Sequence, residues 1–579
     1  MAMRRFPPAL ALGGLLLLTA ACSDGSTTPP TECAATTDPV ALAPLQGTTV
    51  RAADFGRCFQ LQDAGDYLLV PQFASEGPEP ETRNFEPAEP FGFHFGVGSE
   101  PDVTLATASA SRAALPWAGE PRGGGAAARF HAMLRRQEAN LDPRAAATAA
   151  GAGASLMTAQ VTGGGPPASR TFQVLSDLEG ESFTTVTANL KYAGDRIWLY
   201  VDANVPPPGF SDDEWAAFGR LFNTDLFPIN ETNFGTTSDV DNNDHVYVLF
   251  TPVVNSLVQP TPDSPSTSCR SYVAGFFTGF DLAGGTDPNS NRAEIFYSSV
   301  PDPNGVEGCP VRVEQVRSIT PATFIHELQH MISFNQHRLV RGGRSENVWL
   351  NEGLSLIAEE LGGKYYEARY PPPTGRSSPT QLFPDSALGF IQPNLSYAFD
   401  WLTMTSDSSV TTFDNFGSLE ERGGAWLFLR WLGDQKGEGI YRTLVQTNRR
   451  GAANVAAAAG EDFPKLFGDF ALAVYTDSLP GVARSAIPER YRFKSRNFRY
   501  IFQLIANQPS GDGRYPVSPI ELAVGQSDSN DMPQGGIEFY RVGASATAPL
   551  TLRFSRVDRT QLASSLGAQV TIFRLPDAP

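Results

Sequence analysis

Residues 320–330 read TPATFIHELQH and contain the pattern H-E-x-x-H, in which His326 and His330 are four residues apart. We expect a helix here, because Thr320 is a good N-cap residue and Pro321 suits the first helical position. Residues four apart lie on one face of a helix, so both imidazoles can point at a single zinc ion. The pattern therefore predicts a zinc site on a helix.

A second amphipathic helix is expected at residues 349–360, which read WLNEGLSLIAEE. A catalytic zinc site needs a third protein ligand and an open position for water. Glu327, beside the two histidines, can reach such a water molecule. Glu359 follows Glu352 by two turns on the same helix face, where it either supports the site or belongs to a solvated surface.

H-E-x-x-H followed by W-L-N-E-G resembles the gluzincin metallopeptidases, and the wording HELQHMI with WLNEGLS looks like their hyicolysin-like family of secreted bacterial enzymes. The resemblance runs from Phe324 to Glu360. It implies a zincin-type domain with a mixed sheet and a helical lobe. It also implies zinc ligation by His326, His330 and Glu352, with Glu327 as the general base. The implied activity is hydrolysis of protein or peptide substrates by a zinc metalloendopeptidase.

Two related patterns fit less well. Metzincins use H-E-x-x-H-x-x-G-x-x-H, but Ser333 and Gln336 occupy the last two signature positions here, and His337 comes one residue late. We expect His337 to be an ordinary polar residue at a helix end. Gluzincin aminopeptidases carry a G-x-M-x-N segment that grips the substrate amino terminus. The sequence contains no such segment, which favours an endopeptidase.

The reaction should need one more donor to stabilise the transition state, and the candidates are Tyr365, Tyr366 and Tyr397. The competing function is a non-catalytic cell-surface binding lipoprotein with a structural zinc site. Such a site would close its fourth position with a protein ligand, and His337 is the nearby candidate. The intact Glu327 argues against this alternative, because a structural zinc ion needs no base.

Composition and cysteines point to an exported protein. The 579 residues carry a formal net charge of −18, which argues against nucleic acid or an anionic membrane as a partner. Apart from Cys22, the cysteines form an even set: Cys33, Cys58, Cys269 and Cys309. Exported chains meet an oxidising compartment, and pairing of sequence neighbours closes the smallest loops. The sequence leaves the connectivity open, and the expected pairing is the local one, Cys33 with Cys58 and Cys269 with Cys309.

The first 21 residues read as a signal peptide, with charged Arg4 and Arg5 followed by a short apolar core. Residues 19–22, TAAC, resemble a bacterial lipobox in which Thr19 replaces the usual apolar residue. The alternatives are a lipid on Cys22, giving a cell-envelope lipoprotein, and ordinary cleavage, giving a secreted protein. Membrane contact is expected only through that lipid.

The expected fold class is α+β, with a zincin-type domain flanked by N- and C-terminal β-sandwich-like domains. Composition shifts and strand patterns give these boundaries: 22–32 tether, 33–117 N-terminal β domain, 118–168 linker or propeptide segment, 169–484 zinc metallopeptidase domain, 485–579 C-terminal β domain. Residues 292–297 are the candidate edge strand of the central sheet, to which an extended substrate could add.

Residues 239–244, DVDNND, resemble the first half of a calcium-binding loop. The Glu expected at the twelfth position is absent, because Phe250 stands there. The sequence leaves two interpretations open, a bound Ca²⁺ and a plain turn rich in Asp and Asn.

Overall fold

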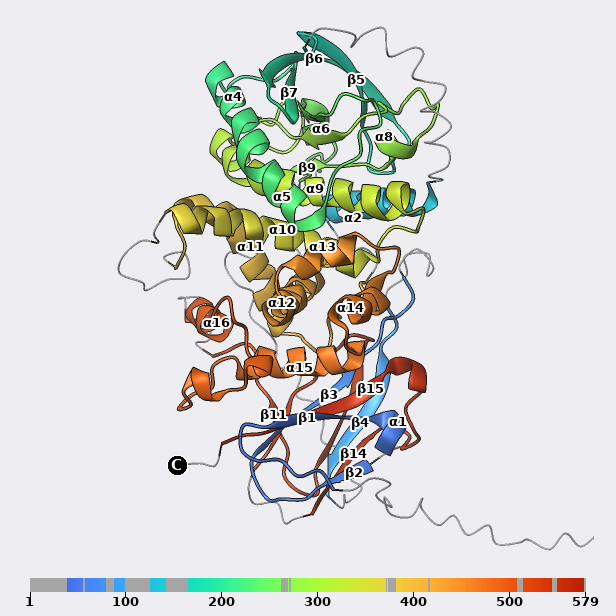
Figure 1. Ribbon diagram of the computed structural model, residues 1–579, viewed down its shortest axis with the longest axis vertical. Coiled ribbons are helices and arrows are strands. Elements are labelled where there is room, and N and C mark those ends of the chain that lie inside the picture. The colour runs from blue at the N-terminus through green and yellow to red at the C-terminus, as the bar shows by residue number, and fades with distance from the viewer. Residues whose placement is uncertain are drawn as a thin grey trace, which may run out of the picture.

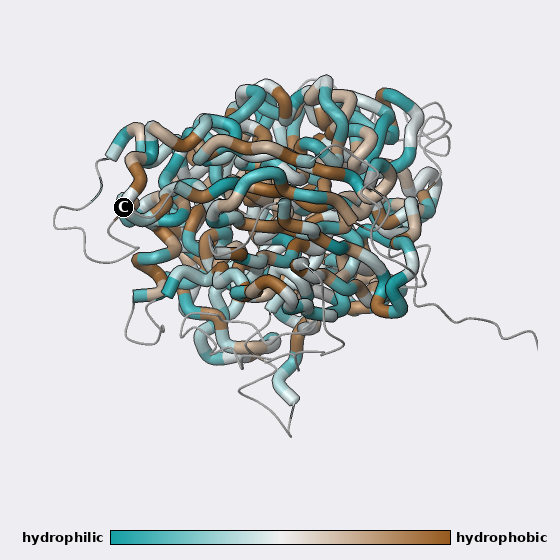
Figure 2. Tube along the Cα trace, turned by 90° about the horizontal axis from the view of Figure 1, so that it is seen from below, coloured by the Kyte–Doolittle hydropathy of each residue, from teal (hydrophilic) through white to brown (hydrophobic). Residues whose placement is uncertain are grey.

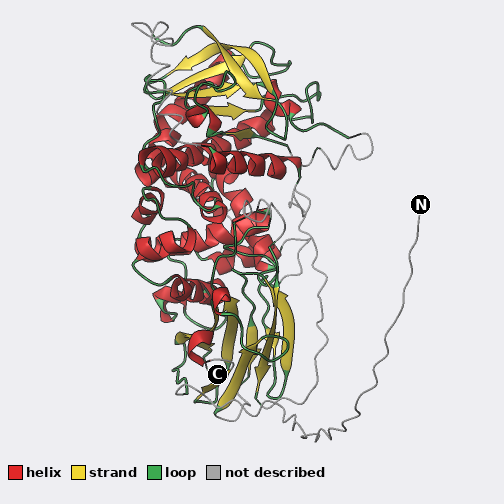
Figure 3. Ribbon diagram, turned by 90° about the vertical axis from the view of Figure 1, so that its right-hand side faces the viewer, coloured by secondary structure: helices red, strands yellow, loops and turns green. Residues whose placement is uncertain are grey.

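The computed structural model describes residues 39–55, 58–79, 88–98, 125–141, 165–261, 269, 272–370, 372, 382–414, 417–507, 514–543 and 549–576. The expected signal peptide, the tether, Cys22 and Cys33 lie outside these residues. The protein is mixed α+β, as predicted. It is elongated, with a sheet at one end, helices across the middle and a β-sandwich at the other end (Figures 1 and 3).

The sheet at the upper end of Figure 1 carries both parallel and antiparallel strands. Its order is β5 (Ser169–Leu175), β6 (Phe183–Ala193), β7 (Ile197–Asp202), β8 (Val246–Phe250), β10 (Ile295–Ser298), β9 (Gly275–Phe276). Strands β7, β8 and β10 run parallel, and β9 pairs antiparallel to β10. The prediction that residues 292–297 form the edge strand is therefore wrong. Strand β10 lies inside the sheet and is buried along its whole length, and β9 is the edge.

Side chains that alternate along the strands separate the two faces of this sheet. On β7, Ile197 and Leu199 join one large apolar core, while Trp198 and Tyr200 join another. The first face is covered by α4 (Asp212–Leu221), the π-helical turn η2 (Phe222–Leu226), α5 (Phe227–Phe234) and α9 (Val313–Phe334). The second face is covered by α2 (Ala126–Asn140) and α6 (Pro252–Ser256).

The helical middle of the molecule follows α9. It contains η3 (Asn335–Val340), α10 (Val348–Arg369), α11 (Asp385–Leu402), α12 (Leu419–Lys436), α13 (Gly439–Val445), α14 (Gly451–Ala459), α15 (Phe463–Thr476), η5 (Arg484–Ala486), η6 (Glu489–Tyr491) and α16 (Phe498–Ala506). The shorter helices are α1 (Ala52–Phe55), α8 (Phe280–Ala283) and η7 (Ser564–Leu566). Residues 485–506, assigned from the sequence to a β domain, thus contain helices.

The sandwich combines strands from the two chain regions that the sequence assigned to separate domains. One sheet has the order β1 (Gly47–Arg51), β15 (Ala568–Arg574), β3 (Tyr67–Phe73), β13 (Tyr540–Val542), β11 (Ile520–Glu521). The other has the order β12 (Ser527–Met532), β4 (Phe91–Val97), β14 (Leu550–Ser555), β2 (Cys58–Leu61). Blue and red strands lie side by side in Figure 1 for this reason. The two separate β domains of the prediction are therefore one sandwich. The prediction missed this because strand patterns in a sequence indicate where strands lie but not which strands pair.

The interior of the sandwich is apolar and rich in aromatic rings. Phe95 stacks on Tyr540 with centroids 4.8 Å apart, and Phe73 stacks on Phe554 at 6.0 Å. Seen from this end of the molecule, many outer turns are hydrophilic while hydrophobic stretches run through the middle (Figure 2). Among the described residues, no helix is both long and apolar enough to cross a membrane.

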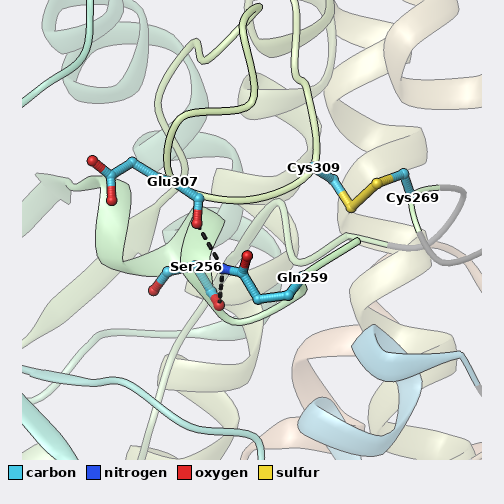
Figure 4. The surroundings of a disulfide bond; sticks show 5 residues. All are labelled: Ser256, Gln259, Cys269, Glu307 and Cys309. Atoms are coloured by element: carbon cyan, nitrogen blue, oxygen red, sulfur yellow. Dashed lines mark hydrogen bonds between the residues drawn. A yellow bond between two sulfur atoms is a disulfide. The ribbon is translucent and has the colours of Figure 1, made fainter. Parts of the chain in front are cut away.

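The predicted pairing of Cys269 with Cys309 is confirmed (Figure 4). The second expected pair includes Cys33 and lies outside the described residues. Close to the observed disulfide, Nε2 of Gln259 donates to the carbonyls of Ser256 at 3.0 Å and Glu307 at 2.6 Å. These bonds tie the segment after α6 to the loop that leads into α9.

Candidate metal centre

The helix that carries H-E-x-x-H begins earlier than the sequence suggests. We expected its start at Thr320, but α9 begins at Val313 and contains Pro321 in its interior. Apolar residues hold the helix in place, because Phe324 and Ile325 are fully buried. The ring of Phe324 also stacks on that of Phe222, with centroids 4.2 Å apart. The opposite side of the helix carries His326 and His330.

Helix α10 is fixed at its start by the sandwich end of the molecule. The indole of Trp349 and the amide of Asn347 both donate to Oε1 of Glu76, at 2.5 and 3.1 Å. Glu76 follows β3 by three residues. Leu350 and Leu354 are fully buried, so the first turns of the helix are held by apolar contacts as well. This anchoring directs Glu352 toward α9.

The three predicted ligands converge. Nε2 of His326 lies 3.2 Å from Nε2 of His330, and each lies 3.7 Å from a carboxylate oxygen of Glu352. Zinc–nitrogen bonds of 2.0–2.1 Å in tetrahedral geometry place two nitrogens roughly 3.3 Å apart, so the histidine pair fits such an ion. Two nitrogens and a carboxylate also form the donor set that catalytic zinc sites use.

A second layer of charged groups surrounds these three residues. Nδ1 of His326 lies 2.7 Å from Oε1 of Glu359, which is buried. Burial by itself lowers the pKa of His326, but hydrogen bonds to Glu352 and Glu359 raise it to about 10. Arg422, from α12, donates to Oε2 of Glu352 at 2.8 Å. Sequence reasoning missed Arg422, since neither its spacing nor its surroundings mark it.

Glu327 is also buried and lies between α9 and the edge of the sheet. Its Oε2 accepts a hydrogen bond from the backbone N–H of Phe277, directly after β9, at 3.0 Å. Its Oε1 lies 3.9 Å from Nδ1 of His131 on α2. Burial raises the pKa of Glu327 to about 7, against the opposing effect of His326. Burial and the nearby Arg422 lower the pKa of His131 to about 3.

Helix α2, from the segment predicted to be a linker or propeptide, packs along the same edge. Arg135 donates to the carbonyl of Phe277 at 3.4 Å, and Glu138 accepts from the N–H of Gly279 at 3.2 Å. The two side chains also form an ion pair of 3.2 Å. An extended peptide that paired with this edge would have to replace the Arg135 hydrogen bond.

The three tyrosines that the sequence offered as donors lie on α10 and α11. Tyr366 packs against Tyr370 and Phe390, with ring centroids 6.4 and 5.5 Å apart, near the C-terminal end of α10. Tyr365, beside it on the helix, is covered by the guanidinium group of Arg369, 3.3 Å from its ring centroid.

Tyr397 lies on α11. His337 lies in η3, fully buried, 3.8 Å from Oε2 of Glu346. The expectation of an ordinary residue at a helix end therefore underestimates the burial of His337. The described residues that could hold a metal ion here are His326, His330 and Glu352.

Comparison with known proteins adds an independent observation. No family model matches the chain. The chain is similar to the neutral metalloprotease ShpI of Staphylococcus hyicus, with 30% identity over 192 residues, which is 31% of this chain. The matched region spans 39% of that relative. The similarity supports a relationship to metallopeptidases, and the converging His326, His330 and Glu352 agree with it.

Proposed function

We propose that this chain is a zinc-dependent endopeptidase of the gluzincin type, similar to the hyicolysin-like enzymes, that acts on protein or peptide substrates outside the cytoplasm. The observation that carries the proposal is the convergence of His326, His330 and Glu352 beside a buried Glu327. The similarity to a neutral metalloprotease supports the same chemistry.

Each residue has a distinct role in this proposal. A bound zinc ion would lower the pKa of a water molecule toward ~7 and polarise the substrate carbonyl. His326 and His330 offer Nε2 and Glu352 offers its carboxylate as ligands. Glu359 holds the Nδ1 proton of His326, which leaves Nε2 free for the metal. Glu327 accepts the proton of the attacking water and returns it to the leaving amine.

We infer that α2 belongs to the peptidase unit and is neither a linker nor a removable propeptide. Phe130 and Leu134 are fully buried in the core that covers one face of the central sheet. A neighbouring face of the helix brings His131 and Arg135 to Glu327 and to the sheet edge. Loss of α2 would expose that core and change the surroundings of the base.

The location of the protein follows from its N-terminal segment and the observed disulfide. We propose export by the signal at residues 1–21, followed by either acylation of Cys22 or release. The disulfide between Cys269 and Cys309 supports an oxidising compartment. Labelled lipid that follows Cys22 and vanishes in Cys22→Ser would separate the lipoprotein from the secreted form.

The decisive experiment changes Glu327→Gln. The amide keeps the size of the side chain and leaves the three ligands intact, but it cannot accept the water proton. Zinc content should stay at the wild-type level, while cleavage of casein should fall by at least ~10². Glu314→Gln, an exposed change on the same helix, is the control. A wild-type protein that holds zinc yet cleaves no protein, peptide or peptidoglycan stem would favour the binding lipoprotein.

A further inference from the structure

The acidic loop at residues 239–244 meets a third carboxylate from a distant part of the chain. Oxygens of Asp239, Asp241 and Glu294 all lie within 4.8 Å of one another. The loop leads into β8, and Glu294 directly precedes β10. Because β8 and β10 are parallel neighbours, residues that precede them meet at the same end of the sheet.

Glu294 is buried, with 1% of its surface exposed. Its Oε1 accepts a hydrogen bond from the N–H of Val240 at 3.0 Å, but its Oε2 has no hydrogen-bond partner among the described residues. Oδ1 of Asp241 is buried and unpartnered in the same way. Burial of carboxylate oxygens without a partner is costly, and three converging carboxylates repel one another. A cation between them would remove both costs.

Neighbouring groups offset these costs in part: Ser238 and the N–H of Val240 oppose the effect of burial on the pKa of Glu294, and Nδ2 of Asn243 donates to Oδ2 of Asp241 at 2.6 Å. Burial raises the pKa of Glu294 to about 7 and that of Asp241 to about 6. The guanidinium of Arg170 opposes the effect at Asp241, but it lies over the ring of Tyr247, 4.1 Å from the centroid.

The loop itself has the shape of a calcium-binding turn. Asp239, Asp241 and Asn243 hold positions one, three and five of the calcium-loop pattern. Asp244 stands at the sixth position with φ +59°, where that pattern has a glycine for its sharp turn. Oδ1 of Asp239 accepts from the backbone N–H groups of Asn243 at 2.8 Å and Asp244 at 3.1 Å.

We propose that Asp239, Asp241 and Glu294 bind one Ca²⁺ ion at a site separate from the His326 centre. Carboxylate oxygens are the ligands that this hard cation prefers. The three carboxylates differ in exposure, and such an irregular ligand set suits the flexible coordination of Ca²⁺ better than the strictly octahedral coordination of Mg²⁺. The carboxylate that the sequence lacks at Phe250 is supplied by Glu294. The ion clamps the 239–244 loop to the start of β10 and so stabilises the central sheet.

The test uses the full-length protein, freed of metal and reloaded with one equivalent of zinc. Terbium can replace Ca²⁺ and is excited by nearby aromatic rings. Here Nδ2 of Asn243 donates to the hydroxyl of Tyr247 at 2.9 Å, and the ring of Trp198 stacks on that of His245 with centroids 4.1 Å apart. We expect sensitised terbium emission that Ca²⁺ displaces and Mg²⁺ displaces far less well. Ca²⁺ should also raise the melting temperature.

Two variants decide the assignment. Glu294→Gln should weaken Ca²⁺ binding by about tenfold or more, since affinity follows the number of charged ligands. Asp213→Asn removes one exposed charge outside the loop and should leave Ca²⁺ affinity unchanged. If Glu294→Gln fails to fold, Asp239→Asn replaces it, because the amide oxygen can still accept the two turn hydrogen bonds.

Wild-type protein that binds zinc but shows neither terbium emission nor a Ca²⁺-dependent melting shift would overturn the proposal. Wild-type Ca²⁺ affinity in both ligand variants would do the same. Zinc content and casein cleavage are measured alongside, so failure at this site is distinguishable from failure of the proposed peptidase.

Discussion

Nδ1 of His326 lies 2.7 Å from a carboxylate oxygen of Glu359, seven residues after Glu352 on the same helix. In the proposed zinc site, one helix therefore supplies both a direct metal ligand and the group that orients a second ligand. The sequence allowed either this role or a solvated surface for Glu359. Its burial, with 8% of the surface exposed, supports the first.

Replacement of Glu359→Gln should lower zinc affinity by ~10–100-fold, the usual effect of losing a partner that orients a ligating histidine. The fold should remain, since the amide keeps the size of the side chain. Competition with a chromophoric chelator measures the affinity. Glu367→Gln is the matched control, because Glu367 lies on the same helix but pairs with Arg496 at 2.7 Å. Equal affinities in the two variants would disprove an orienting role.

His326→Ala should abolish stoichiometric zinc binding and leave a folded protein. The helices that carry the ligands are held by fully buried residues, including Phe324 and Leu350, and not by the metal alone. Its melting temperature should match that of metal-free wild type. Zinc at 100 times its dissociation constant should stabilise the wild type by about 2.7 kcal/mol. Metal analysis measures the zinc content and calorimetry measures the melting temperature. A variant that fails to fold would instead indicate a structural ion.

Leu134→Ala should reduce the free energy of unfolding by ~2–5 kcal/mol, because this side chain of α2 is fully buried. Urea unfolding measures the change, and Arg136→Ala, at an exposed position of the same helix, should have little effect. Mass spectrometry of the active enzyme should detect residues 126–140. An active form that lacks them would show that α2 is a propeptide.

Stability at acid pH should depend on Glu461. Burial tends to raise its pKa, but hydrogen bonds from Lys436, Arg490 and Lys465 lower it to about 2. Because the folded-state pKa is depressed, the contribution is fully present above the unfolded value of about 4.5 and is lost as pH falls toward 2. Glu461→Gln should therefore lose ~1 kcal/mol at pH 6.

Near pH 2, most of the difference in unfolding free energy between the wild type and Glu461→Gln should be gone. Urea titrations at both pH values measure it, with the exposed Glu179→Gln as control. A loss that is equal at both pH values would contradict the assigned ion pairs.

The sequence predicted the centre of the site better than its surroundings. Helical spacing alone placed His326 and His330 together, and the family resemblance supplied Glu352. Arg422 could not be predicted, because it comes from another helix 70 residues after Glu352 and no local pattern marks it. His131 was hidden in the same way, since its helix read as part of a linker.

The fold was predictable as a list of elements and less so as an arrangement. Buried strand β10 was mistaken for an edge because a short apolar run does not reveal how many neighbours it has. Thr320 and Pro321 read as a helix start, yet the flanking contacts of α9 tolerate the proline inside the helix.

The sandwich brings together segments that leave the ribosome far apart in time. Gln72 on β3 hydrogen-bonds to Thr571 on β15, 499 residues later. At about 5–20 residues per second, β3 waits roughly 25 to 100 seconds for this neighbour. Throughout that interval an apolar strand with open backbone groups is available to wrong partners. We expect the nascent chain to need a holding chaperone for β3, and the sandwich to close only after the central sheet has formed.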